Sequence, residues 1–275
     1  MIVVTGASGN VGRGVVAALA EAGVPVTAVS RRGNDHAQAM PGVRHVRADL
    51  ADPPTLKEAF DDADALFLLV AGEDPTEILE GAKAAGIRRV VLLSSQGAGT
   101  RPDSYRHPAA FEEAVRRAGL QWTILRPTGF ASNAYQWAES VRTQRVAAAP
   151  FADVALPVVH PADISAVAAA TLLTPDRHIG RTYVLTGPAA VTPRAQVEAI
   201  GAAVGEQVAF VELTRDQARA RLLNVMPEAV ADSTLAILGT PTSEEQQVSP
   251  GVQAVLGRPA RAFAEWAREN APGFR

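Results

Sequence analysis

The segment Thr5-Gly6-Ala7-Ser8-Gly9-Asn10-Val11-Gly12 decides the fold, because it sets three glycines at the spacing G-x-x-G-x-x-G. The apolar run Ile2–Thr5 precedes these glycines, and a stretch of helical period, Val11–Ala22, follows them. In such a unit the first glycine permits a tight turn, the second lets the backbone approach a pyrophosphate, and the third lets helix and strand pack closely. We therefore predict that cofactor phosphates bind at a helix N-terminus formed by Gly6, Ser8, Gly9, Asn10, Val11 and Gly12.

The turn begins a regular series of apolar runs and helical stretches, which distinguishes it from an ordinary glycine-rich turn. Parallel strands buried on both faces are nearly continuous apolar runs, as Ala65–Val70 and Val90–Ser94 are. Further strands are expected at Ile2–Thr5, Val26–Ser30, Val43–Arg47 and Thr123–Arg126, and helices at Val11–Ala22, Pro54–Phe60, Thr76–Ala85 and Ala109–Ala118. This pattern predicts an α/β, Rossmann-type doubly wound parallel sheet as a cofactor-binding domain over residues 1–150.

The alternation weakens after Pro127. The segment Pro157–Ile164 is interpreted as a strand and a turn, with Asp163 as the cap of a helix that runs to Leu173. With a strand at Thr182–Thr186, residues 157–187 are expected to return to the main sheet. The remainder predicts helices at Pro193–Val204, Arg215–Leu223, Glu228–Leu238 and Gly251–Glu269, and one strand at Val208–Leu213. Residues 188–275 should thus form a smaller, mostly helical lobe for a substrate or a partner, over the C-terminal edge of the sheet.

The residues after the second strand indicate which cofactor binds. An acidic side chain there commonly accepts the ribose hydroxyls of NAD(H), but this chain has Ser30, Arg31 and Arg32 and no carboxylate before Asp35. Planar guanidinium groups bind phosphate in bidentate fashion, so this sequence favours the 2′-phosphate of NADP(H). The alternative is a solvated arginine pair on a loop.

Composition excludes several other function classes. The chain has 275 residues, 47% hydrophobic and 20% charged, which suits one globular unit with a small appended lobe. A net charge of −3 without a basic run argues against nucleic-acid binding, and no apolar stretch approaches the roughly 20 residues that cross a membrane. The chain has no cysteine, and no second ligand stands at metal spacing from His160, so no metal site is expected. Without signs of a secretion signal, the cytoplasm is the expected compartment.

Several segments within about the first 190 residues resemble the atypical short-chain dehydrogenase/reductase superfamily, and its NmrA-like group in particular. They are Thr5–Gly12, Ala48-Asp49-Leu50, Leu92–Ser95, Ala118–Pro127 and His160–Ile164. The resemblance implies that Asp49 and Leu50 flank the adenine. It also implies that Val70, Ala71 and Gly72 line the cofactor near its ribose, and that Ser94, Pro127 and Phe130 approach the nicotinamide.

The chain departs from the wider superfamily at the catalytic dyad. Reductases of that superfamily commonly use Tyr-x-x-x-Lys, in which the lysine lowers the pKa of the tyrosine. Here Tyr105 is followed four residues later by Ala109, and no lysine follows Lys83. Related NmrA-like proteins often carry a histidine or lysine ahead of a glutamate, for which the nearest equivalents are His107 and Glu112.

Three side chains remain as candidates for catalysis. His107 can donate a proton, since a histidine pKa of about 6.5 suits exchange near neutrality; the alternative is an exposed loop histidine. Tyr105 is a weaker candidate, because an unassisted phenol with a pKa of about 10 is a poor base. Ser95 follows the fifth strand and is placed to polarise a substrate oxygen, unless it is a plain turn serine.

A substrate wall is expected after the sixth strand. Thr128, Asn133, Tyr135 and Trp137 would supply its aromatic and polar contacts, with Phe130 beside them. The alternative is that the aromatic residues only pack the smaller lobe. His160 is expected to shape the turn before Asp163.

These features favour an NADPH-dependent oxidoreductase that reduces a small, apolar, quinone-like or aromatic or conjugated carbonyl acceptor. A reduced quinone can take its proton from water, which accounts for the missing dyad. The alternative is a non-catalytic NADP(H) redox sensor of NmrA type that acts through a regulatory protein partner. A redox-neutral lyase or isomerase is a third, weaker hypothesis. A homodimer is compatible with the sequence.

Overall fold

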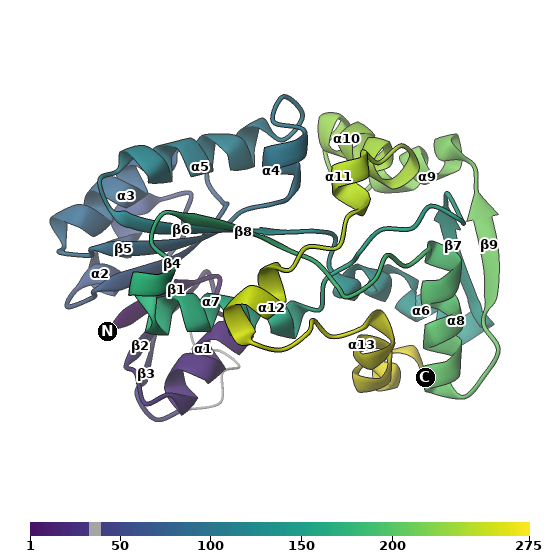
Figure 1. The fold of residues 1–275 in the computed structure, drawn as a ribbon, viewed down its shortest axis with the longest axis horizontal. Coiled ribbons are helices and arrows are strands. Elements are labelled where there is room, and N and C mark those ends of the chain that lie inside the picture. The colour runs from purple at the N-terminus through teal and green to yellow at the C-terminus, as the bar shows by residue number, and fades with distance from the viewer. Residues whose placement is uncertain (33–39) are drawn as a thin grey trace.

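A computed structural model describes residues 1–32 and 40–275, and within these ranges seven strands form one parallel sheet. The order is β3-β2-β1-β4-β5-β6-β8, so β1 and β4 lie side by side in the interior of the sheet (Figure 1). The strands are β1 (Ile2–Thr5), β2 (Val26–Ser30), β3 (Val43–Arg47), β4 (Ala65–Leu69), β5 (Arg89–Leu93), β6 (Gln121–Pro127) and β8 (Arg181–Leu185). The predicted Rossmann-type α/β fold is confirmed, because the order turns back between β1 and β4 as a doubly wound sheet requires.

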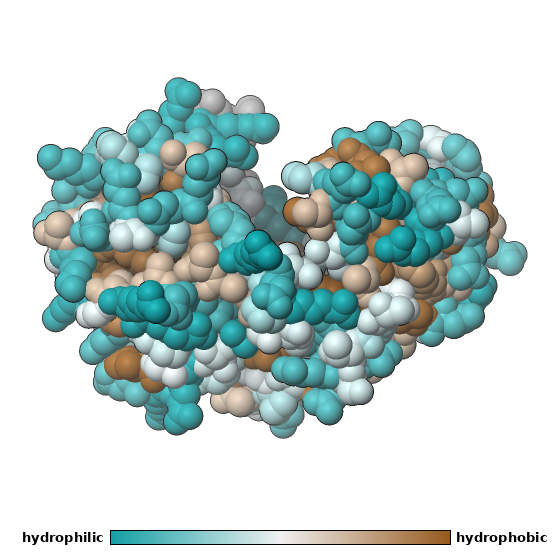
Figure 2. Space-filling view, turned by 90° about the horizontal axis from the view of Figure 1, so that it is seen from above, coloured by the Kyte–Doolittle hydropathy of each residue, from teal (hydrophilic) through white to brown (hydrophobic). Residues whose placement is uncertain are grey.

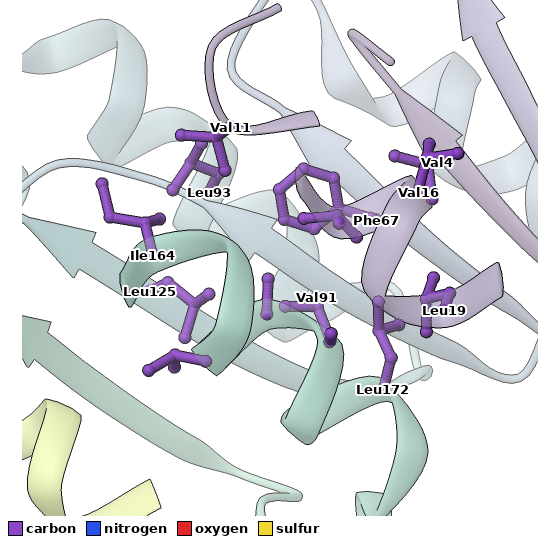
Figure 3. Packing of buried hydrophobic residues seen from close by; sticks show 14 of the residues in the cluster. Val4, Val11, Val16, Leu19, Phe67, Val91, Leu93, Leu125, Ile164 and Leu172 are labelled. Carbon is purple, nitrogen blue, oxygen red and sulfur yellow. The ribbon is translucent and has the colours of Figure 1, made fainter. Parts of the chain in front are cut away.

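Helices cover both faces of the sheet. On one face, α1 (Gly12–Glu21) and α7 (Pro161–Leu173) pack with Val4, Phe67 and Val91 into one buried cluster (Figure 3). The other face carries the helices η1 (Pro53–Leu56), α2 (Lys57–Phe60), α3 (Pro75–Ala84), α4 (Gly97–Thr100) and α5 (Arg106–Arg117). Both clusters combine apolar residues of the strands with the apolar faces of the helices that cover them.

Helix α7 supports the glycine turn from behind. A Cβ atom on Gly14 of α1 would lie 2.6 Å from Ser165 Oγ, so α1 and α7 approach as closely as a glycine allows. The Ser165 hydroxyl donates a hydrogen bond to the Val11 carbonyl at 2.8 Å. The first turn of α1 is thereby fixed against the buried helix α7.

The smaller lobe contains a second, two-stranded parallel sheet of β7 (Val146–Pro150) and β9 (Ala209–Leu213). Around it lie η2 (Ala131–Trp137), α6 (Ala138–Gln144), α8 (Pro193–Val204), α9 (Arg215–Leu222), α10 (Glu228–Gly239), α11 (Ser243–Gln246), α13 (Phe263–Glu269) and η4 (Ala271–Phe274) (Figure 1). Residues 131–150 therefore pack with the tail of the chain. The division into domains at residues 150 and 188 stays a prediction.

Part of the tail returns to the main sheet as α12 (Gly251–Leu256), which packs on α7 and β8. A Cβ atom on Gly251 would lie 2.1 Å from the Val184 carbonyl oxygen, to which the Ser249 hydroxyl donates at 2.8 Å. Segment 249–251 thus covers the outer edge of β8. Within the described ranges, no helix has both the length and the apolar character needed to cross a membrane.

Three predictions about local structure are wrong. Residues 157–159 form only an isolated bridge, Phe130 to Val159, because the chain there links the two sheets. The helix expected over Gly251–Glu269 is broken by Gly257, which has a φ of +68°, and by Pro259. Asp163 is not the cap of α7.

The cap of α7 is His160, which shapes this turn as expected. Its Nδ1 accepts the Ala162 amide at 3.1 Å, and Pro161 begins the helix. Asp163 instead lies fully buried in the first turn, where Arg258 donates to its carboxylate at 2.7 Å. It therefore anchors the segment between α12 and α13 to the main part of the molecule.

Candidate functional site

The site lies at the carboxyl ends of the parallel strands, where open α/β sheets bind ligands. These ends face the smaller lobe, and Figure 2 shows the surface hollowed between the two parts of the molecule. A separate cavity of about 380 Å³ lies on the smaller lobe between α8 and β9, and none of the predicted site residues lines it. The candidate functional site is therefore placed at the strand ends and not in this cavity.

The glycine turn has no room for side chains on its inner side. Gly6 has a φ of +62°, and a Cβ atom there would lie 2.1 Å from Leu69 Cδ1. A Cβ atom on Gly12 would lie 2.1 Å from the Gly6 carbonyl oxygen. On the outer side, Ser8, Gly9 and Asn10 are exposed, so the turn presents this face to solvent at the start of α1, where a pyrophosphate would bind. The Gly9 amide itself donates to the Gly6 carbonyl at 2.9 Å.

The two predicted arginines follow β2 at the outer side of this turn. Arg31 and Arg32 are exposed, and neither forms an ion pair with a carboxylate in the described part of the chain. Ser30 is buried at the end of β2, beside Arg47 of β3. Gly33 and Asp35, which the sequence argument also used, lie outside the described residues. Both guanidinium groups are thus accessible to a phosphate.

The loops after β3 and β4 meet beside the turn. Gly72 has a φ of +84°, and a Cβ atom there would lie 2.6 Å from the Leu50 carbonyl oxygen. Asp49 Oδ1 accepts the Ala51 amide at 3.0 Å, which fixes its carboxylate at the end of β3. Val70 and Ala71 are half-buried at the start of the second loop. The structure therefore brings together the residues predicted to contact the adenine and ribose.

The His107 side chain connects the segment of catalytic candidates to the loop after β4. Its Nε2 lies 2.6 Å from the Gly72 carbonyl oxygen, and its ring packs edge-on against Phe111 at a centroid distance of 5.0 Å. Because a carbonyl only accepts hydrogen bonds, Nε2 must carry a hydrogen. Nδ1 is then the nitrogen that can exchange a proton with a substrate.

Ser94 belongs to a buried polar cluster that the sequence argument missed. Its hydroxyl donates at 2.7 Å to Glu112 Oε1, which also accepts Arg126 Nε at 2.8 Å. Arg126 and Arg116 both donate to Glu112 Oε2, and the side chain is 1% exposed. Burial raises the pKa of Glu112, but the hydrogen bonds from Arg126 and Ser94 outweigh it, and the pKa lies below its ordinary value. Ser94 can then offer only acceptor lone pairs to a ligand.

Ser95 and Tyr105 lie on either side of α4. The Ser95 Oγ accepts the Gly97 amide at 3.2 Å, as in an ordinary serine turn. The Tyr105 ring covers Gly97 so closely that a Cβ atom there would lie 2.6 Å from the ring. Burial raises the pKa of the Tyr105 phenol, and the nearby Glu245 carboxylate raises it further, although Arg101 opposes this. The phenol is therefore protonated at neutral pH and is no general base.

The predicted substrate wall is mostly occupied with internal contacts. The Thr128 hydroxyl donates to the Pro157 carbonyl at 2.7 Å, and Trp137, 5% exposed, donates to the Ala148 carbonyl at 3.0 Å. The Tyr135 ring stacks on Phe274 at a centroid distance of 5.6 Å. The structure thus favours the alternative in which these aromatic residues pack the smaller lobe. Asn133 is exposed, and Phe130 packs against the buried cluster that α1 and α7 form with the main sheet.

Within residues 1–32 and 40–275, no group of three or more histidine and carboxylate side chains is arranged to hold a metal ion. The residues present instead suit a dinucleotide. A glycine turn without space for Cβ atoms, exposed amides at a helix start and two accessible arginines match its phosphates.

Fold and turn together define the class of protein. The chain belongs to the NAD(P)H-binding family, whose model matches residues 6–175. The predicted resemblance to the NmrA-like group is confirmed, and so is the predicted class of NADPH-dependent oxidoreductase.

Particular relatives are reductases. The chain is 38% identical over 284 residues to a (4-alkanoyl-5-oxo-2,5-dihydrofuran-3-yl)methyl phosphate reductase of Streptomyces griseus, covering 100% of this chain and 99% of that protein. It is 32% identical over 289 residues to an NAD(P)H azoreductase of Xenophilus azovorans, covering 100% and 99%. A crystal structure of an NADPH-dependent quinone oxidoreductase of Escherichia coli with NADPH matches with a TM-score of 0.81 and 25% identity, covering 98% and 99%.

Proposed function

We propose that this protein reduces a small, apolar, conjugated acceptor, such as a quinone, an azo compound or an unsaturated ketone, at the expense of NADPH. The observation that carries the proposal is the glycine turn between β1 and α1, which has no room for Cβ atoms at Gly6 and Gly12 and exposes Ser8, Gly9 and Asn10. The relatives support a reductase of conjugated compounds. When bound, NADPH supplies a hydride, that is, both electrons of the reduction.

The residues of the chain bind and orient the reactants. The start of α1 around Asn10 would hold the pyrophosphate, and Arg31 and Arg32 would hold the 2′-phosphate. Asp49 would meet the adenine end. Because Ser94 donates to Glu112, its oxygen is left to accept a hydrogen bond from the nicotinamide end. Alignment of the reactants in a shielded cleft then provides most of the rate enhancement.

The remaining proton has two sources. His107 would deliver it from Nδ1, since Nε2 is held on the Gly72 carbonyl. A quinone-like acceptor can also take it from water after the hydride has been transferred. Tyr105 would contribute at most a hydrogen bond from its neutral phenol, because its pKa is raised.

The test is NADPH oxidation by the purified protein with a panel of a benzoquinone, a naphthoquinone, an azo dye and an unsaturated lactone. Turnover with at least one conjugated acceptor, and none with a saturated ketone, is the expected result. Tight NADPH binding without turnover on the whole panel would overturn the proposal and favour the redox sensor that acts through a protein partner.

We predict that NADP(H) binds at least about tenfold more tightly than NAD(H), because each guanidinium adds a charge-assisted contact to the 2′-phosphate. The double variant Arg31→Ala, Arg32→Ala should remove this preference in calorimetric titrations. Arg117→Ala, on the exposed side of α5, is the matched control for lost positive charge. An unchanged preference in the double variant would show that other residues select the cofactor.

A further inference from the structure

The loop that carries the catalytic candidates is clamped to the smaller lobe by a bidentate ion pair. Arg101 Nε lies 2.7 Å from Glu245 Oε1, and one terminal Arg101 nitrogen lies 2.8 Å from Glu245 Oε2. The same nitrogen donates to the Thr240 carbonyl at 2.8 Å, and the Thr100 hydroxyl donates to Glu245 at 2.9 Å. Two segments 144 residues apart in sequence thus meet beside the cleft.

Glu245 is held rigidly on its own side. Its Oε2 accepts the Thr242 amide at 2.8 Å while its own amide donates to Thr242 Oγ1, which closes a capping box at the start of α11. The Glu245 side chain is 1% exposed. The carboxylate is therefore a fixed point of the smaller lobe.

Arg101 is held just as firmly on the main part of the molecule. Its carbonyl accepts the amides of Ser104 and Tyr105 at 3.0 and 2.9 Å. The Tyr105 ring lies on Gly97, and α5 begins at the next residue and carries His107. Movement of Arg101 would therefore move the segment between Ser95 and His107.

Charges of opposite sign surround this contact. The hydrogen bonds to Glu112 raise the pKa of Arg126 although burial opposes this, and the charge of Glu244 on the smaller lobe raises it further. The Gln96 side chain points toward the Glu244 carbonyl at 3.5 Å. A buried ion pair is often no more stabilising than an apolar pair of the same size. The distinctive property of a bidentate pair is its fixed geometry.

We infer that Arg101 and Glu245 are positioning residues for the acceptor: their ion pair sets the smaller lobe against the loop that carries Ser95, Tyr105 and His107. This inference rests on the proposed function. The smaller lobe has a second anchor on the other face of the sheet, where Asp163 receives Arg258 and the Arg261 amide. Loss of the Arg101–Glu245 pair should therefore loosen the cleft without detaching the lobe.

The experiment compares wild type with Arg101→Gln, Glu245→Gln and the conservative Arg101→Lys. Arg258→Gln is the matched control, because it removes an ion pair of the other anchor. Arg101→Gln should raise the acceptor KM by about tenfold or more, since alignment of the reactants is lost. The Kd for NADPH should stay within about twofold, because the glycine turn and the two arginines proposed to hold its phosphates lie outside the segment between Ser95 and His107.

Amide hydrogen exchange gives a readout that needs no turnover. Exchange in residues 97–105 and 240–247 should rise by at least about tenfold in Arg101→Gln and less in Arg101→Lys. Arg258→Gln should leave the acceptor KM and these two segments unchanged.

An unchanged acceptor KM, unchanged exchange, or an equal weakening of NADPH binding in folded Arg101→Gln would each overturn the inference. If wild type turns over no acceptor at all, the proposed function fails. The exchange of the two segments then decides by itself whether the ion pair holds them together.

Discussion

Two strand-to-helix connections of the same sheet are built on opposite principles. The turn between β1 and α1 is shaped by backbone alone, with glycines at the points where a Cβ atom would collide with Leu69 or with the Gly6 carbonyl. The connection between β5 and α5 is held by charged side chains, Arg126 on Glu112 and Arg101 on Glu245. In the proposed function, the first connection would hold the cofactor, and the second would shape the acceptor end of the cleft.

The difference teaches where specificity can vary. A pyrophosphate is the same in every dinucleotide, and a turn of backbone amides suits it without any side chain. An acceptor differs from one reductase to another, and side chains fixed by ion pairs can be exchanged without disturbing the sheet. Substitutions in the first connection should therefore abolish NADPH binding. Substitutions in the second connection should change the activity by smaller, variable amounts.

The largest effect is expected from Gly9→Val. A branched side chain would occupy the exposed side of the turn, where the pyrophosphate would bind, so NADPH affinity should fall by more than about a hundredfold. Circular dichroism should still report a folded protein, because the nearest atom to a Cβ at this position is the Gly6 oxygen at 3.1 Å. Gly81→Ala in α3 is the control, since its Cβ would meet only Phe60 at 3.7 Å. Retained binding in a folded Gly9→Val protein would refute the placement of the turn.

An intermediate effect is expected from Glu112→Gln. The change leaves the Arg126 guanidinium buried beside a neutral amide, which should lower the free energy of unfolding by roughly 3 kcal/mol in chemical denaturation. Glu113→Gln, in an exposed pair with Arg117 on the same helix, should leave the denaturation midpoint nearly unchanged. Equal midpoints for the two variants would mean that the cluster does not stabilise the second connection.

The same cluster predicts a pH dependence. The pKa of Glu112 in the folded protein lies below its ordinary value of 4.5, so the folded state favours the carboxylate. Its contribution to stability is complete above that ordinary value and disappears as the pH falls through the lower folded-state pKa. Thermal unfolding between about pH 3 and pH 7 should therefore show a smaller loss of Tm on acidification for Glu112→Gln than for wild type. Parallel curves would contradict this assignment.

The smallest effect is expected from Tyr105→Phe. A phenol with a raised pKa is no base, so its loss should change kcat by less than about tenfold, whereas loss of a general acid typically costs about a hundredfold or more. His107→Ala is the companion variant, because its Nδ1 remains for proton exchange. A large loss in Tyr105→Phe alone would show that the phenol acts directly on the acceptor.

The strands of the main sheet were predictable because each carries its own pattern. Ala65–Leu69 and Val90–Leu93 are continuous apolar runs, as expected of strands that are buried on both faces of a parallel sheet. By contrast, β7 is Val-Ala-Ala-Ala-Pro, an alanine-rich segment of low strand propensity. It is a strand because it pairs with β9, and no local pattern reports that partner.

The site residues that carry a local sequence pattern were predictable, as the strands of the main sheet were. The glycine turn is one of them, because its conformation requires glycine. The sequence also carries local signals for the break at Gly257 and Pro259 and for the Thr242-x-x-Glu245 capping box. The partnership of Glu245 with Arg101 was not visible, since it depends on how two lobes are placed and either residue alone reads as a solvated charge.

The contact of segment 249–251 with the outer edge of β8 has a consequence for folding during synthesis. On the ribosome, the last strand of the sheet is complete once residue 185 has been added, but Ser249 and Gly251, which cover its outer edge, follow only later. During that interval the nascent chain exposes an uncovered parallel strand, and such edges favour aggregation. We expect chains truncated near residue 240 to be recovered mainly as aggregates, even though every strand of the main sheet is present.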